Sequence, residues 1–139
     1  PGRILVPTNG SAAARQAAEL AFRLAGPDDL VVLLHVARGY DDAYRRGFTD
    51  SDERRLAAGQ AIVGELAALG QAYGIRTLPL VRIGNAPDET TLQIAEELGC
   101  GLILLGTDVR PGSDRLFLGP RVERILEAAR APVVVYNAS

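Results

Sequence analysis

Two uninterrupted apolar segments constrain the fold of this chain more than any other sequence feature. They comprise residues 30–36 (LVVLLHV) and residues 102–105 (LILL), and neither alternates between apolar and polar positions. A strand without alternation is usually covered on both faces, which is typical of a parallel sheet between two layers of helices. Both segments are far shorter than the roughly 20 apolar residues of a membrane-spanning helix, so we expect no membrane crossing within these residues.

Helical patterns separate these segments from three further strands. The additional strands are expected at residues 3–7, 75–83 and 132–136. Apolar side chains recur at helical spacing in residues 14–24, 56–73, 92–98 and 122–129. Asp50 with Glu53 resembles a capping pair at the start of the second helix. The order βαβαβαβαβ predicts an α/β, doubly wound fold: a five-stranded parallel sheet with helices on both faces, in one domain over residues 1–139.

Missing residue types exclude several classes of site. All 15 basic residues are Arg, so a P-loop lysine, a Schiff-base lysine and the lysine of a phospho-receiver site are absent. One Cys and one His rule out a disulfide framework and a histidine-rich metal site. The net charge of -2 gives no reason to expect nucleic acid as a partner. The single thiol and the lack of a visible signal peptide suit the cytoplasm.

The loops at the carboxyl ends of the strands are the expected place for a ligand. In doubly wound sheets, ligands bind beyond these ends, at the point where the strand order reverses. This rule selects residues 7–11, the residues that follow Val36, and residues 106–122.

The third of these loops carries the features of an anion site. Gly106 ends a buried strand and Gly119 opens a helix, whose first N–H groups and positive dipole end attract phosphate. Arg110, Arg115 and Arg121 add guanidinium groups that suit the same anion. The alternative is that the two glycines serve turn geometry alone and that the arginines are solvated.

Five segments carry a resemblance to a known family. They are ILVPTNGS at the start, LLHV in the second strand, GNAPDET at a helix entry, LILLGT in the fourth strand, and APVVV near the end. With these segments the chain resembles the universal stress protein family over its whole length. The resemblance implies an adenine nucleotide alpha hydrolase-like fold, ATP or AMP as ligand, and at most slow ATP hydrolysis rather than an enzyme's activity.

The family's nucleotide loop reads G-x-x-G, nine residues, then G-[S/T], and this chain departs from it at two positions. Gly106 and Gly119 keep the frame, whereas Val109 replaces the second glycine and Pro120 replaces the hydroxyl residue. Val109 places bulk where backbone would approach phosphate, and Pro120 offers neither an N–H nor a hydroxyl. Asn9 stands where the family usually has Asp. The resemblance therefore implies a nucleoside slot with a weakened phosphate cradle.

By this resemblance, ten residues are expected to bind the nucleotide. They are Pro7, Thr8, Asn9, Val36, Gly106, Asp108, Val109, Gly119, Arg121 and Val122. Asp108 could hold Mg²⁺ with a nucleotide or simply cap its turn. No catalytic residue and no resident metal site are assigned. His35 is expected to be a hydrogen-bonded core or strand-end residue rather than a base, and Cys100 a buried thiol.

One partner, a second copy of the chain, is expected, and attachment to a membrane transporter is left open. Universal stress domains typically dimerise through the last strand, so the resemblance implies a homodimer formed by Val133, Val134 and Val135. The FLGP variant at residues 117–120 also resembles universal stress domains attached to cation/proton antiporters. The chain, which opens at Pro1, is then either a free-standing protein or a cytoplasmic regulatory domain of a membrane transporter. Its function is nucleotide sensing or, alternatively, dimerisation and regulation without a nucleotide.

Overall fold

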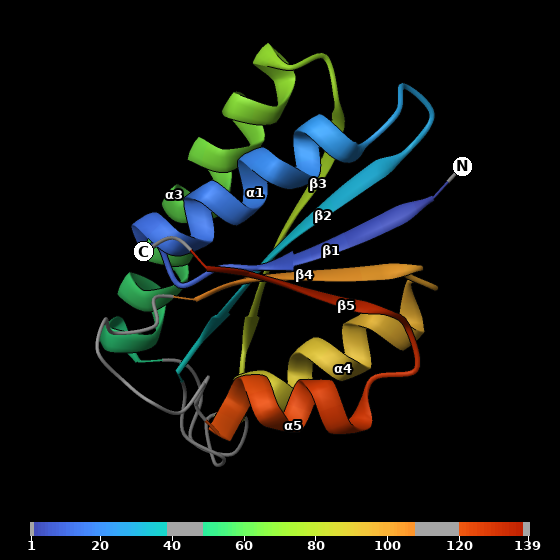
Figure 1. The fold of residues 1–139 in the computed structure, drawn as a ribbon. Coiled ribbons are helices and arrows are strands. Elements are labelled where there is room, and N and C mark those ends of the chain that lie inside the picture. Colours follow the sequence, from blue (N-terminus) through green and yellow to red (C-terminus); the bar gives the residue numbers. More distant parts are fainter. Residues whose placement is uncertain (1, 39–48, 108–119, 138–139) are drawn as a thin grey trace.

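The computed structural model describes residues 2–38, 49–107 and 120–137. Within them, five strands alternate with four helices (Figure 1). The strands are β1 (Arg3–Pro7), β2 (Leu30–Ala37), β3 (Arg76–Ile83), β4 (Leu102–Thr107) and β5 (Val133–Asn137). The helices are α1 (Ala12–Leu24), α3 (Asp50–Ala72), α4 (Pro87–Glu97) and α5 (Pro120–Ala128).

All five strands are parallel and follow the order β3-β2-β1-β4-β5. The chain therefore starts in the middle of the sheet, builds outward through β2 and β3, and then returns to the other side of β1 for β4 and β5. This reversal places the switch point between β1 and β4. The predicted doubly wound α/β fold is confirmed.

Helices cover both faces of the sheet, α1 and α3 on one face and α4 and α5 on the other (Figure 1). Alternate residues of β2 serve the two sides: Val31 and Leu33 belong to the core beneath α1 and α3, whereas Val32 and Leu34 belong to the core beneath α4 and α5. Both faces of this strand are buried, which explains why its sequence shows no alternation.

Polar side chains fix the starts of the first two helices. Ser11 caps α1, because its hydroxyl accepts a hydrogen bond from the N–H of Ala14 at 3.2 Å. Helix α3 begins with a capping box between Thr49 and Asp52, so the expectation of an Asp50 and Glu53 pair was wrong. A capping box needs a hydroxyl or carboxylate just before the helix and its partner three residues later, and Asp50 already lies inside the helix.

Strands β3 and β5 form the two edges of the sheet. Pro79 lies within β3, at an edge where a missing N–H is tolerated. In β5, Val134 is 39% exposed. None of the helices described is long and apolar enough to cross a membrane.

Candidate functional site

A cavity of about 320 Å³ lies at the carboxyl ends of the central strands. Strands β1, β2 and β4 supply its floor, and the first turns of α4 and α5 lie over it. Its lining consists of Pro7, Thr8, Asn9, Ala14, Leu34, His35, Val36, Arg38, Pro87, Asp88, Thr91, Leu105, Gly106, Arg121, Val122 and Ile125. This is the switch point at which doubly wound sheets bind ligands.

The turn after β1 is held by its own hydrogen bonds. The N–H of Thr8 donates to the carbonyl of Leu34 at 2.8 Å, and the Thr8 hydroxyl accepts from the N–H of Gly10 at 3.2 Å. Oδ1 of Asn9 accepts from the N–H of Ser11 at 3.0 Å, which fixes the orientation of the side-chain amide. The amide oxygen is thereby engaged, and Asn9 offers a ligand the two N–H donors of Nδ2.

His35 links this turn to the neighbouring strand. Its Nδ1 lies 2.8 Å from the carbonyl oxygen of Thr8, and a carbonyl can only accept, so Nδ1 carries the proton. The ring also lies against Gly59 of α3, where an added Cβ would come within 2.7 Å of Cδ2. The prediction of a hydrogen-bonded strand-end histidine is confirmed. Sequence reasoning did not place His35 among the cavity residues, where the structure puts it.

Gly106 is required by packing. A Cβ at this position would lie 2.2 Å from the carbonyl oxygen of Ala13 and 3.0 Å from the nitrogen of Ala14, both in the backbone of α1. The glycine lets the end of β4 approach the first turn of α1, and both elements line the cavity. A close approach of two backbones explains this glycine independently of any phosphate.

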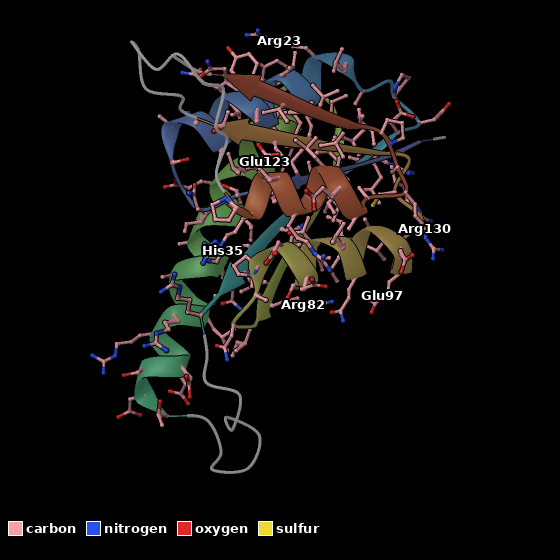
Figure 2. The ribbon with its side chains drawn as sticks, turned by 60° about the horizontal axis from the view of Figure 1, so that its bottom comes forward. Arg23, His35, Arg82, Glu97, Glu123 and Arg130 are labelled. Carbon is pink, nitrogen blue, oxygen red and sulfur yellow. The ribbon has the colours of Figure 1, made fainter. Side chains whose placement is uncertain are left out.

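The roof of the cavity is a pair of helices tied together at the same end. Glu89 in the first turn of α4 pairs with Arg124 of α5, with 2.8 Å between the carboxylate and guanidinium. Thr91 is buried, and its hydroxyl donates to the carbonyl of Pro87 at 2.7 Å. In Figure 2, His35 lies at the cavity end of this layer, whereas Glu97 and Arg130 lie at its far end.

Three charged side chains line the cavity: Arg38 after β2, Asp88 in α4 and Arg121 in α5. Within the described residues, no hydrogen bond or ion pair uses any of their side chains. Asp88 is half-buried, whereas the two arginines are exposed. These groups are therefore available to a ligand.

Seven of the ten residues expected to bind the nucleotide lie around this one cavity. They are Pro7, Thr8, Asn9, Val36, Gly106, Arg121 and Val122. The other three, Asp108, Val109 and Gly119, lie outside the described residues. The structure thus brings together the residues of all three predicted loops, and their role toward a nucleotide stays a prediction.

Sequence reasoning missed the contribution of α4. Pro87, Asp88 and Thr91 line the cavity, although the GNAPDET segment was interpreted only as a helix entry. The predicted parallel sheet already indicated such a contribution, because the loop after β3 lies at the carboxyl ends of the strands, as the three selected loops do. Its backbone is tied to β2 by a hydrogen bond of 2.9 Å from the N–H of Gly84 to the carbonyl of Ala37.

A larger hollow, of about 670 Å³, lies toward the amino ends of the strands, between the C-terminal ends of α4 and α5. Cys100 lines it, and burial raises the pKa of this thiol, while Arg3 opposes the effect. The expected burial of Cys100 is confirmed. None of the seven expected nucleotide-binding residues that the structure describes lines this hollow. No group of three or more His, Cys, Asp or Glu side chains that could hold a metal ion occurs in the described part of the chain.

The fold and the cavity together define a class: a doubly wound α/β protein with a cavity at its switch point. Comparison with known proteins gives the family. The model of the universal stress protein family matches residues 2–137, and the chain therefore belongs to this family.

Individual relatives agree with this assignment. Universal stress protein MJ0531 of Methanocaldococcus jannaschii is 24% identical over 137 residues, which cover 96% of this chain and 80% of the relative. The crystal structure of a universal stress family protein from Burkholderia pseudomallei superimposes with a TM-score of 0.77 at 25% identity, covering 99% of this chain and 96% of the other. A family protein from Arabidopsis thaliana, solved with AMP bound, superimposes with a TM-score of 0.71 at 18% identity, covering 99% and 94%.

Proposed function

We propose that this chain is a regulatory module that binds an adenine nucleotide in the cavity at the switch point. The observation that carries the proposal is the convergence of three separate loops on one cavity of about 320 Å³, a volume within the range of small-molecule sites. The relative from Arabidopsis thaliana binds AMP on the same fold, which supports the choice of ligand.

The charges around the cavity favour one orientation of the nucleotide. Arg121 lies at the positive start of α5, whereas the charges of Arg38, which follows β2, and Asp88, which follows β3, offset each other. Adjacent strands are about 4.8 Å apart, so β2 and β4, with β1 between them, are separated by roughly 10 Å. The phosphate is accordingly proposed to lie near Arg121, and the base near Val36.

The phosphate end is proposed to be weak. Helix α5 begins at Pro120, which lacks the N–H that the first helical position of a phosphate cradle would donate. The Arg121 guanidinium, at the start of the same helix, is the donor proposed for the anion. Phosphate should therefore add modestly to the affinity of the nucleoside, and the module should sense AMP or ATP rather than hydrolyse it quickly.

Calorimetric titration with adenosine, AMP and ATP tests the proposal. We expect all three to bind, and the Arg121→Gln variant to lose affinity for AMP while it keeps its affinity for adenosine. Arg23→Gln is the matched control, because Arg23 lies in the last turn of α1, away from the cavity. Absence of binding by every adenine compound would refute the proposed function.

A double variant tests the weak phosphate end. Val109→Gly with Pro120→Ser restores the glycine and the hydroxyl of the family's loop, and ATP binding should tighten. An unchanged isotherm for ATP would contradict the explanation.

One observation favours a second candidate function, a dimerisation and regulatory module that needs no nucleotide. β5 is an edge strand, and Val134 on it is 39% exposed, so its apolar edge is open to a second copy. We propose a homodimer through Val133, Val134 and Val135, in a free chain or in the cytoplasmic domain of a cation/proton antiporter. Light scattering should give twice the mass of one chain, and Val134→Lys should halve it; a monomeric parent protein would refute the dimer.

A further inference from the structure

We infer that Asp88 is the residue that reads the base: its carboxylate accepts a hydrogen bond from the exocyclic amino group of adenine. This inference rests on the proposed function. It adds a specificity-determining residue on α4, the element whose contribution to the cavity sequence reasoning missed.

The placement of Asp88 differs from that of its neighbour. Glu89 points its carboxylate at Arg124, at a distance of 2.8 Å, and both of these side chains are half exposed. Asp88 is more buried and lines the cavity, and within the described residues its carboxylate takes part in no hydrogen bond or ion pair. A partly buried carboxylate without a partner loses hydration, and a ligand N–H donor restores the lost hydrogen bond.

Among the described residues that line the cavity, Asp88 carries the one carboxylate, which is a stronger acceptor for an N–H than the neutral Nε2 of His35 or the hydroxyl oxygen of Thr8. Asn9 has its Oδ1 engaged by the N–H of Ser11, so its free side-chain groups are donors. Arg38 supplies donors only, and Thr91 already donates its hydroxyl to the carbonyl of Pro87. A ligand's amino group has to find its charged acceptor at Asp88.

The position relative to the sheet agrees with a base at this end. Asp88 follows β3 and Arg38 follows β2, and these two strand ends are joined by the hydrogen bond from Gly84 to Ala37. Arg121, the proposed phosphate ligand, lies at the start of α5; this helix follows β4, which is three strands from β3, and it is joined to the start of α4 by the Glu89–Arg124 ion pair. A carboxylate beside the phosphate would repel it, whereas beside the base it selects an amino-substituted ring.

An electrostatic role in the helix is the competing explanation, because an acidic residue in the first turn of α4 also favours the helix dipole. Such a role changes the stability of the fold but not the relative affinity for two nucleosides that differ in one amino group. The ratio of those affinities therefore separates the two explanations.

The experiment compares adenosine with purine riboside, which lacks only the amino group. Calorimetry on the wild-type chain should show adenosine binding about tenfold more tightly, the change expected for one hydrogen bond to a charged group. In Asp88→Ala the ratio should fall close to one, and Asp88→Asn, a neutral acceptor, should give an intermediate ratio. Glu97→Ala is the matched control, because it removes a carboxylate from the far end of the same helix and should leave the ratio at its wild-type value.

The outcomes distinguish this inference from the proposed function. If wild-type protein binds AMP but Asp88→Ala weakens both nucleosides by the same factor, or neither of them, the role of Asp88 is overturned and the nucleotide site stands. If guanosine binds as tightly as adenosine, the reading of adenine by Asp88 is likewise overturned. If no adenine compound binds the wild-type chain, the proposed function and this inference fall together.

Discussion

The glycines of α3 provide a test of how tightly this helix packs behind the cavity. Gly59 and Gly64 both lie inside the helix, where glycine normally costs about 1 kcal/mol relative to alanine. Gly64 has no other group within 4 Å of an added Cβ. At Gly59 the same Cβ would lie 2.7 Å from Cδ2 of His35 and 3.0 Å from Cγ1 of Val81. Alanine should therefore have opposite effects at the two positions.

The expected magnitudes follow from these contacts. In Gly59→Ala the His35 ring must retreat by about 0.7 Å to reach the 3.4 Å at which ordinary contact begins. Overpacking of this kind costs about 1–3 kcal/mol, and the gain in helix propensity returns about 1 kcal/mol. We expect a net loss of about 1 kcal/mol for Gly59→Ala and a gain of about 1 kcal/mol for Gly64→Ala. At about 4 °C per kcal/mol for a domain of this size, the two melting temperatures should differ by about 8 °C.

Thermal unfolding followed by circular dichroism gives this difference directly, with urea unfolding as a check on the free energies. The nitrogen resonances of His35 provide a local readout, because displacement of the ring lengthens its hydrogen bond to Thr8. Equal stabilisation by both substitutions would refute the close packing between α3 and the strand that leads into the cavity.

Two more predictions concern residues at the ends of inner strands, Gly106 in β4 and Asp29 before β2. Gly106→Ala should destabilise the fold by more than about 2 kcal/mol and weaken AMP binding, because the new Cβ would lie 2.2 Å from a backbone oxygen of α1. Gly101→Ala is the control, because an added Cβ there meets open space. Equal melting temperatures for the two variants would contradict the prediction. Hydrogen bonds from the N–H groups of Gly26 and then Gly2 hold the pKa of Asp29 below its ordinary value of 3.8. The contribution of Asp29 to stability should therefore be present above pH 3.8 and be lost as the pH falls through the folded-state pKa. An NMR titration that places the folded-state pKa at or above 3.8 would contradict this prediction.

The fold could be predicted from the sequence because two inner strands, β2 and β4, are buried on both faces. The unbroken apolar character of β2 and β4, together with the alternation of strands and helices, leaves few arrangements besides a parallel sheet. The start of α3 was less predictable. Thr49, Asp50, Asp52 and Glu53 offer several pairings of similar chemistry, and the register of the first turn decides which pair forms the box.

The candidate site was predictable in part, for a related reason. Thr8, Val36 and Gly106 each follow a recognisable strand, so the rule for switch points selects them. Asp88 follows an edge strand and resembles an ordinary acidic residue in the first turn of a helix. Only the tertiary structure shows that one carboxylate of α4 lines the cavity while the next one pairs with α5.

The most direct test of a nucleotide site at the switch point is a crystal structure of the chain grown with AMP. The base should lie against Val36 and Thr8, with the phosphate beside Arg121. A cavity that stays empty at saturating AMP, or AMP bound instead in the hollow lined by Cys100, would contradict the account.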